Sequence, residues 1–235
     1  MEQFVKNLIY RYPVLAENRD SIFRAFEIIK TSYESGGKLL AAGNGGSSSD
    51  ADHIVGELMK GFALPRKVDK NFADRLKSVD AQKGVELSER LQCALPAIAL
   101  SNHNSLNTAF LNDVDGSMCF AQQVNGYGNP GDVLLAISTS GNSQNILYAA
   151  VTARAKGMKI VGLTGKGGGK LSSFADEMIS VNESETYKVQ ELHLPVYHCL
   201  CLMLENYFFY NKACSESGKG ESIDCRSESI IQDLK

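Results

Sequence analysis

Short apolar runs alternate with longer amphipathic stretches along most of the chain. Five runs predict strands: residues 38–42, 96–101, 133–138, 159–163 and 177–181. The run 133–138 is almost entirely apolar, which is typical of a parallel strand covered on both faces. The intervening stretches predict helices, the last of them containing Pro195: residues 1–36, 47–61, 103–124, 143–156 and 186–210. Strands that alternate with helices predict a doubly wound, Rossmann-like α/β fold, in which a parallel sheet is flanked by helices.

Two segments depart from this alternation. Residues 60–95 are rich in charged side chains and contain two weakly amphipathic pieces, around 71–78 and 84–92, so we expect a helical flap or a decorated loop. Residues 213–235 contain few apolar side chains and predict a flexible tail. No Pro/Ser-rich linker divides the remainder. We therefore predict one domain over residues 1–212, with 60–95 as an insertion.

Composition argues against several classes of partner. With 24 basic and 27 acidic side chains the formal net charge is −3, so no net positive field attracts nucleic acid or an anionic membrane. No apolar stretch approaches the ~20 residues that span a bilayer, and the first residues lack the apolar run of a signal peptide. Six cysteines without a CxxC pair predict reduced thiols. These features predict a cytoplasmic protein.

Two loops that follow predicted strands have the composition of ligand-binding turns. The first, residues 43–50 (GNGGSSSD), combines glycines, which let a ligand approach the backbone, with serines that can cap a helix. The second, residues 138–143 (STSGNS), places four hydroxyls before a helix start, whose N–H groups can bind phosphate without Lys or Arg. Ligands of parallel sheets bind at the carboxyl ends of the strands. We therefore expect both loops to face one site.

Familiar nucleotide motifs are incomplete. Ser48 stands where a dinucleotide-binding fingerprint needs its third glycine, and Thr164 stands at the first glycine of a P-loop. Leu171 also replaces the metal-binding Ser or Thr of a P-loop. The sequence thus argues against NAD and ATP, and we expect no organic cofactor.

Candidate acid–base groups lie on two of the predicted helices. His53 and Glu57 are four residues apart and share a helix face. Gln190 and His198 are eight residues apart and lie on roughly one face of the last helix, with His193 turned partly away. A carboxylate and an imidazole beside a phosphate cradle are what proton transfer next to a carbonyl requires. Most surface pairs of this kind have no function, so the pairs indicate proton transfer only if the fold brings them together beside the loops.

Taken in order over residues 1–210, these motifs resemble the sugar isomerase (SIS) domain family, and within it the phosphoheptose isomerases. Four segments carry the resemblance: 43–58, 138–143, 163–170 and 190–198. It implies a five-stranded parallel sheet and a homo-oligomer, a tetramer or dimer, with active sites at subunit interfaces. The reaction implied converts the small phosphorylated sugar sedoheptulose 7-phosphate to D-glycero-D-manno-heptose 7-phosphate through an enediol.

The resemblance also assigns roles to residues. Glu57 would be the catalytic base and His198 its acid–base partner. The residues expected to contact the phosphosugar are Asn44, Gly45, Gly46, Ser47, Asp113, Ser138, Thr139, Ser140, Ser143 and Gln190. Some members bind zinc, and the matching positions are His53, Glu57, Gln190 and His198. Two histidines, a carboxylate and an amide oxygen can complete a zinc site, although glutamine is an uncommon ligand.

Other functions fit parts of the pattern. SIS domains also serve as phosphosugar sensors or protein-binding modules, but a sensor does not need Glu57 or His198. A hexose or pentose phosphate is an alternative substrate, because a phosphate loop does not read the number of carbons. The insertion 60–95 is longer than the link usual in the family, so it could alter substrate choice. A lyase or an amidotransferase partner domain is weakly supported, because no extra domain is attached.

Overall fold

The computed structural model describes residues 1–216, with side chains up to Tyr210. Five strands form one parallel sheet in the order β2-β1-β3-β4-β5. The strands are β1 (Leu39–Ala42), β2 (Ala97–Ala99), β3 (Val133–Ser138), β4 (Lys159–Thr164) and β5 (Glu177–Ser180). This sheet confirms the predicted doubly wound α/β fold.

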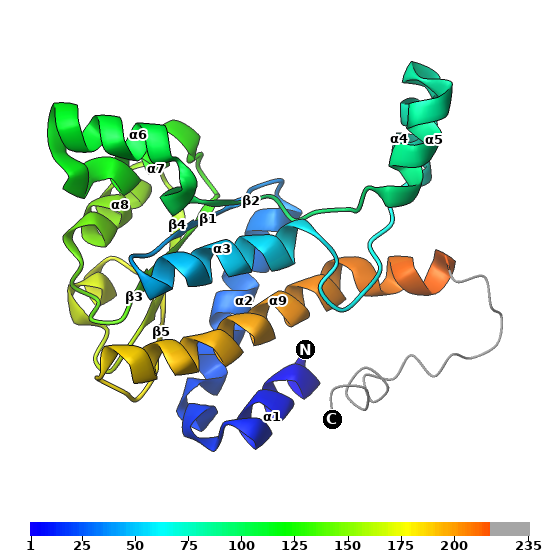
Figure 1. Ribbon diagram of the computed structural model, residues 1–235. Coiled ribbons are helices and arrows are strands. Elements are labelled where there is room, and N and C mark those ends of the chain that lie inside the picture. Colours follow the sequence, from blue (N-terminus) through cyan, green and yellow to red (C-terminus); the bar gives the residue numbers. More distant parts are fainter. Residues whose placement is uncertain (217–235) are drawn as a thin grey trace.

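Helices cover both faces of the sheet (Figure 1). The α-helices are α1 (Glu2–Arg11), α2 (Arg19–Glu34), α3 (Gly46–Met59), α4 (Lys70–Val79), α5 (Ala81–Arg90), α6 (Asn104–Phe110), α7 (Cys119–Tyr127), α8 (Gln144–Ala155) and α9 (Thr186–Glu216). Short 3₁₀ turns are η1 (Pro13–Asn18), η2 (Leu100–Asn102), η4 (Gly116–Met118) and η5 (Gly169–Ser173), and η3 (Leu111–Asp115) is a π-helical turn.

The two faces of β1 supply two separate cores. Leu39 and Ala41 pack with the apolar side chains of α1, α2, α3 and α9. Leu40 and Ala42 point the opposite way, toward α7 and α8. This alternation follows from the two-residue period of a strand. Every residue of β1 and β3 is buried, as a strand covered on both faces requires.

The strand order creates a topological switch point at the carboxyl ends of β1 and β3. β1 and β3 are hydrogen-bonded neighbours, with Leu39 opposite Val133 and Ala42 opposite Ala136. After β1 the chain crosses one face of the sheet to β2, and after β3 it crosses to β4 on the other side of β1. Ligands of such sheets bind in the crevice at this topological switch point. The two serine-rich loops predicted from the sequence leave the sheet there.

The charged insertion forms a helical hairpin, α4–α5, that stands away from the body of the molecule (Figure 1). Its helices begin at aspartate caps, because the Asp69 and Asp80 carboxylates accept backbone N–H groups of the first turns. At its base, Lys67 pairs with Gln92 in an antiparallel bridge. The structure therefore shows two helices in the predicted insertion.

The last helix is longer than predicted. α9 runs through Pro195 as one helix and ends at Glu216, so residues 213–216 of the predicted tail are helical. Residues 217–235 lie outside the described part of the chain. The four cysteines with described side chains, at positions 93, 119, 199 and 201, are free thiols; the side chains of Cys214 and Cys225 lie outside it. Among the described helices, none is both long and apolar enough to cross a membrane.

Candidate active site

Close packing shapes the loop between β1 and α3. Gly45 has a φ of 54°, which favours glycine. A Cβ on Gly43 would lie 2.2 Å from the carbonyl oxygen of Ser47, so no larger residue fits without movement of the backbone. A Cβ on Gly46 would lie 2.6 Å from Nε2 of Gln190. The Gln190 amide of α9 therefore rests directly against the start of α3.

The loop between β3 and α8 gathers hydroxyl groups at a helix start. The Oγ atoms of Ser138 and Ser143 are 3.0 Å apart, and the backbone N–H of Asn142 donates to Oγ of Ser140 at 3.2 Å. Ser143 precedes α8 without capping it through its side chain. The first turn of α8 therefore keeps N–H groups that a phosphate can accept, with hydroxyl groups beside them.

Asn145 connects these two loops, and the sequence analysis missed it. Its side chain lies in the first turn of α8 and exchanges two hydrogen bonds, of 2.9 and 2.8 Å, with the side chain of Asn44. The pair spans the switch point between β1 and β3. The signal in the sequence was its position two residues after Ser143, where the loop ends, but its hydrogen-bond partner depends on the fold.

Glu57, His53 and His198 meet where α3 and α9 lie side by side (Figure 1). His53 Nε2 is 3.2 Å from Oε1 of Glu57 and 3.5 Å from Nε2 of His198. The other carboxylate oxygen of Glu57 is buried without a hydrogen bond, and the ammonium of Lys60 lies 3.5 Å from it. The structure thus brings the predicted base and its predicted partner into one cluster.

The electrostatic surroundings of His198 favour its neutral form. Burial lowers the pKa of His198, and the neighbouring His53 lowers it further, while Glu57 opposes the shift. A neutral imidazole carries one N–H and one lone pair, so it can accept a proton at one atom and pass it to another. His198 is therefore suited to proton transfer between two oxygens of a substrate.

Two residues behind His53 also belong to this cluster: Asp50, which ends the first predicted loop but was given no role, and Tyr197, which was not predicted. The Tyr197 hydroxyl lies 3.0 Å from Nδ1 of His53 and donates to Oδ1 of Asp50 at 3.3 Å. Burial raises the pKa of Asp50, and the hydrogen bond from Tyr197 opposes the shift. The sequence offered a tyrosine next to His198, but a buried aromatic residue on a helix reads as core.

Two of the predicted site residues lie apart from this cluster. Gln190 contacts the start of α3, whereas His53 lies about two turns further along that helix. Asp113 is exposed in η3, where its carboxylate accepts a hydrogen bond from the Asn112 side chain at 2.7 Å. Within the described chain no hydrogen bond joins Asp113 to the two loops.

The four predicted zinc ligands do not form one donor set. The described residues contain no group of three or more His, Cys, Asp or Glu side chains arranged to hold a metal ion. His53 contacts both Glu57 and His198, but the described ion pairs include none between Glu57 and His198. Zinc needs its ligand atoms within about 2.0–2.3 Å of one centre. The described residues thus show no complete zinc site, and zinc binding stays a prediction from the resemblance.

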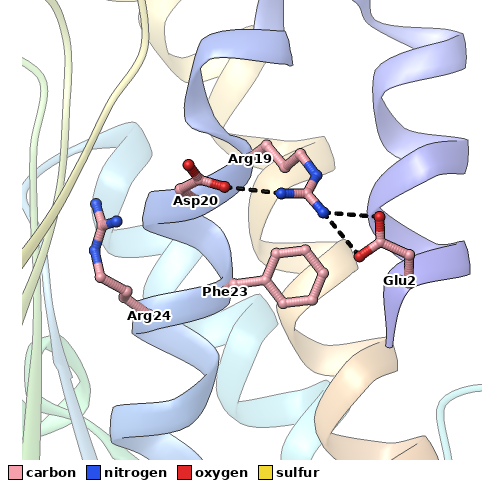
Figure 2. A pocket seen from close by; sticks show the side chains of 5 residues that line it. All are labelled: Glu2, Arg19, Asp20, Phe23 and Arg24. Atoms are coloured by element: carbon pink, nitrogen blue, oxygen red, sulfur yellow. Dashed lines mark hydrogen bonds and ion pairs between the residues drawn. The ribbon is translucent and has the colours of Figure 1, made fainter.

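A surface hollow of about 390 Å³ between α1 and α2 lies outside this site (Figure 2). Figure 2 shows Arg19 between Glu2 and Asp20, with which it forms ion pairs of 2.8 and 2.9 Å. Arg24 of the same hollow pairs with Glu177. Because both arginines that line the hollow are paired with carboxylates, it offers a phosphosugar no unpaired arginine.

Comparisons with known proteins agree with this architecture. Residues 81–165 match the family model described as the SIS domain. The phosphoheptose isomerase of Rhodospirillum rubrum is 38% identical over 192 residues, which cover 82% of this chain and 88% of that protein. That of Methylibium petroleiphilum is 43% identical over 169 residues, or 71% of this chain and 72% of that protein.

A solved structure extends the agreement to the fold. The phosphoheptose isomerase from Francisella tularensis superposes with a TM-score of 0.69 at 31% identity, covering 87% of this chain and 96% of that chain. A parallel five-stranded sheet with serine-rich loops at its switch point, together with these matches, defines a sugar isomerase domain protein. More narrowly, the chain belongs to the phosphoheptose isomerase family.

Proposed function

We propose that this chain is an aldose–ketose isomerase that converts sedoheptulose 7-phosphate to D-glycero-D-manno-heptose 7-phosphate. The observation that carries the proposal is the Glu57 carboxylate, which has one buried oxygen without a hydrogen bond and lies in a cluster with His198. The name shared by the relatives supports a phosphorylated seven-carbon sugar as the substrate.

In this proposal the loop after β3 binds the phosphate. The hydroxyls of Ser138, Thr139, Ser140 and Ser143 surround the start of α8, so hydrogen bonds and the helix dipole replace a basic side chain. The sugar lies toward the loop after β1, where Asn44, Gly45, Gly46, Ser47 and Gln190 are gathered. Gln190 thus acts as a sugar contact at the start of α3.

The chemistry requires no net gain or loss of protons. Glu57 takes a proton from C1 of the ketose, and the released electron pair forms the C1=C2 bond of an enediolate. Neutral His198 accepts the proton of the O1 hydroxyl and delivers it to O2. The electrons of the resulting C1 alkoxide then form the aldehyde, and C2 takes the proton back from Glu57. Such positioned proton transfer typically contributes about 10²–10⁴-fold to a rate.

We also propose that the enzyme acts as a homo-oligomer, a tetramer or dimer, in the cytoplasm. Asp113 is exposed and lies apart from the cluster of His53, Glu57 and His198 in the same subunit. We therefore expect Asp113 to contact the sugar bound at the site of a neighbouring subunit. Free thiols at the four described cysteines are typical of a reducing compartment. Sedimentation of the purified protein tests the oligomer.

The resemblance adds zinc as a further expectation, and the mechanism does not use it. Metal analysis of the purified enzyme, with assays and thermal unfolding in a chelator, tests whether the protein binds zinc and needs it for activity. Full activity and an unchanged melting temperature in a metal-free sample would remove zinc from the account. One equivalent of zinc, lost together with activity, would require Gln190, Glu57 and His198 to move toward a common centre.

The experiment that tests the function follows sedoheptulose 7-phosphate by NMR in the presence of purified protein. Anomeric signals of an aldose heptose phosphate are the expected result. Parallel samples with ketohexose and ketopentose phosphates identify the preferred chain length. No turnover of any of them would contradict the proposal and favour the non-catalytic sensor, whose ligand binding a thermal-shift measurement would then detect.

A further inference from the structure

The Tyr197 hydroxyl lies between an imidazole and a carboxylate in the interior of the site. Tyr197 is 2% exposed and directly precedes His198 on α9. Its ring stands edge-on to that of His53, with centroids 5.5 Å apart at 74°. The hydroxyl is 3.0 Å from His53 Nδ1 and 3.3 Å from Asp50 Oδ1. One polar atom therefore contacts two groups on successive turns of α3.

These two contacts depend on each other because a hydroxyl has a single proton. The Tyr197 hydroxyl donates that proton to Asp50, so its oxygen is left to accept one from Nδ1 of His53. Nδ1 then carries a ring proton in either charge state: a neutral His53 presents an Nε2 lone pair that can accept from His198, and only a charged His53 can donate from Nε2 to Glu57. The opposite ring atom, Nε2, consequently faces Oε1 of Glu57 and Nε2 of His198 in a fixed orientation.

Core packing alone does not account for this arrangement. A phenylalanine would fill the same apolar space, whereas the hydroxyl serves only its polar contacts. The Asp50 carboxylate has one buried oxygen without a hydrogen bond, and burying a carboxylate costs free energy. A chain that needed only a stable α3–α9 contact would gain more from apolar side chains at both positions.

We propose that Tyr197, anchored on Asp50, is a positioning residue that fixes the tautomer and the orientation of His53 toward Glu57 and His198. The inference rests on the proposed function, because it assigns Tyr197 to the cluster that contains the proposed base. It extends the site to Tyr197, which neither the loops nor the acid–base pairs indicated, and gives a role to Asp50, the last residue of the first predicted loop. A catalytic base that is oriented by a third group is a general arrangement in enzymes.

The first test compares two Tyr→Phe variants on the same helix. Tyr197→Phe should lower kcat by about 10- to 100-fold and leave KM within about twofold, because orientation and not binding is lost. Tyr207→Phe is the matched control, since its hydroxyl also contacts a carboxylate, Oε1 of Glu34 at 2.5 Å, away from the cluster. Wild-type kcat in Tyr197→Phe would overturn the proposal.

The second test does not depend on turnover. The chain has four histidines, so side-chain ¹⁵N signals can be assigned with single histidine substitutions. In the wild type, His53 should show a protonated Nδ1. Tyr197→Phe should shift both His53 signals toward a tautomer average, with those of His103 unchanged. Unchanged His53 signals would overturn the positioning role even if kcat falls.

A third variant, close in shape to the wild type, tests whether Asp50 anchors Tyr197. Asp50→Asn keeps the shape of the anchor but removes its charge, and should shift the His53 signals in the same direction by a smaller amount. His53 signals that match the wild type in this variant would contradict an anchoring role for Asp50. If the wild-type protein isomerises no phosphosugar, the proposed function fails, while the NMR comparison still decides the contact between Tyr197 and His53.

Discussion

Asn44 and Asn145 exchange two side-chain hydrogen bonds across the switch point of the sheet. Each amide donates through its nitrogen and accepts through its oxygen, so neither side chain can turn without breaking both contacts. Asn145 also accepts the backbone N–H of Ile146 at 3.0 Å, within the first turn of α8. The pair fixes the distance between the loop after β1, proposed to contact the sugar, and the loop after β3, proposed to bind the phosphate.

A double-mutant cycle tests this pair. Asn44→Ala and Asn145→Ala should each lower the free energy of unfolding by about 1 kcal/mol, and the double variant should cost little more than either. Urea unfolding provides the values. Asn7→Ala combined with Asn44→Ala serves as the control, because these distant changes should add. Additive losses for Asn44 and Asn145 would show that the two amides act independently.

Replacing the proposed base should separate binding from chemistry. Glu57→Gln keeps the size of the side chain but removes the oxygen that accepts the proton, so kcat should fall by about 10²–10⁴-fold. Calorimetric binding of the substrate should remain close to wild type. Glu27→Gln is the matched control on α2, where the carboxylate is exposed and pairs with Lys30. A near-normal kcat in Glu57→Gln would remove Glu57 from its role.

The loss of a single hydroxyl from the proposed phosphate-binding loop should affect mainly substrate affinity. Ser140→Ala removes one donor among several, so KM should rise by about 3- to 10-fold with a smaller change in kcat. Steady-state kinetics measure both. Ser173→Ala provides the comparison, because the Ser173 hydroxyl donates to the Lys170 carbonyl, outside the loop. An unchanged KM in Ser140→Ala would place the phosphate elsewhere.

The ion pair between Arg66 and Glu205 joins the base of the hairpin to α9. Both side chains are almost completely buried, and the Arg66 guanidinium also donates to the carbonyls of Glu57 and Leu58 at the end of α3. Arg66→Met should therefore lower the free energy of unfolding by about 3–5 kcal/mol, because it leaves Glu205 buried without its cation.

Urea unfolding should distinguish this pair from an exposed one. Arg24→Met breaks the pair with Glu177 on the surface, where the arginine side chain is 60% exposed, and should cost much less stability than Arg66→Met. If Arg66→Met and Arg24→Met lose the same free energy of unfolding, burial does not make the pair between Arg66 and Glu205 more important for stability. The placement of Arg66 also predicts that its loss reduces kcat, since it holds the helix end that carries Glu57.

The buried imidazole of His193 should make the protein sensitive to acid. Burial lowers the pKa of His193 to about 4, and the nearby Thr164 backbone offsets only part of this. The folded pKa lies below the unfolded value of about 6.5, so the unfolded chain binds the extra proton. The stability from this group is complete above pH 6.5 and is lost as the pH falls toward 4.

The full shift corresponds to about 3 kcal/mol of unfolding free energy. Urea unfolding at pH 7, 5.5 and 4.5 measures it, and His193→Leu should show a smaller loss between pH 7 and 4.5 than the wild type. His103→Leu, at a half-buried ring beside Tyr127, should keep the wild-type loss. If His193→Leu loses as much unfolding free energy between pH 7 and 4.5 as the wild type, the acid sensitivity arises from other groups.

Most strands and helices could be predicted from the local spacing of apolar and polar residues. The strand 133–138 was predicted with its observed bounds, because a run of apolar residues bounded by glycine and serine has few alternatives. The insertion was expected to be a helical flap or a decorated loop from its two weakly amphipathic pieces; it forms two helices, each with an aspartate cap that was not used in the prediction. The extension of α9 to Glu216 was missed because its last turns lack the apolar periodicity that marks a packed helix.

The site was only partly accessible from sequence. Loop composition and helix spacing indicated the serine loops and His53 with Glu57, since these signals are local. The partners of Asn145 and Tyr197 could not be predicted, because each hydrogen bond joins residues about 100 or more positions apart. Gln190 and His198 were predicted on roughly one face of the last helix, and both contact α3, at Gly46 and at His53; which part of α3 each one meets depends on packing that helix periodicity does not specify.

The position of α9 has a consequence for how the molecule is made. α1 and α3 both pack against α9, although more than 120 residues separate α3 from it in the sequence. A ribosome therefore releases the first helix and the helix of Glu57 long before their shared partner exists. Contacts between such distant segments slow folding and leave apolar faces exposed during synthesis. The nascent chain therefore gains the cluster of His53, Glu57 and His198 only after all five strands of the sheet have been made, when His198 of α9 arrives.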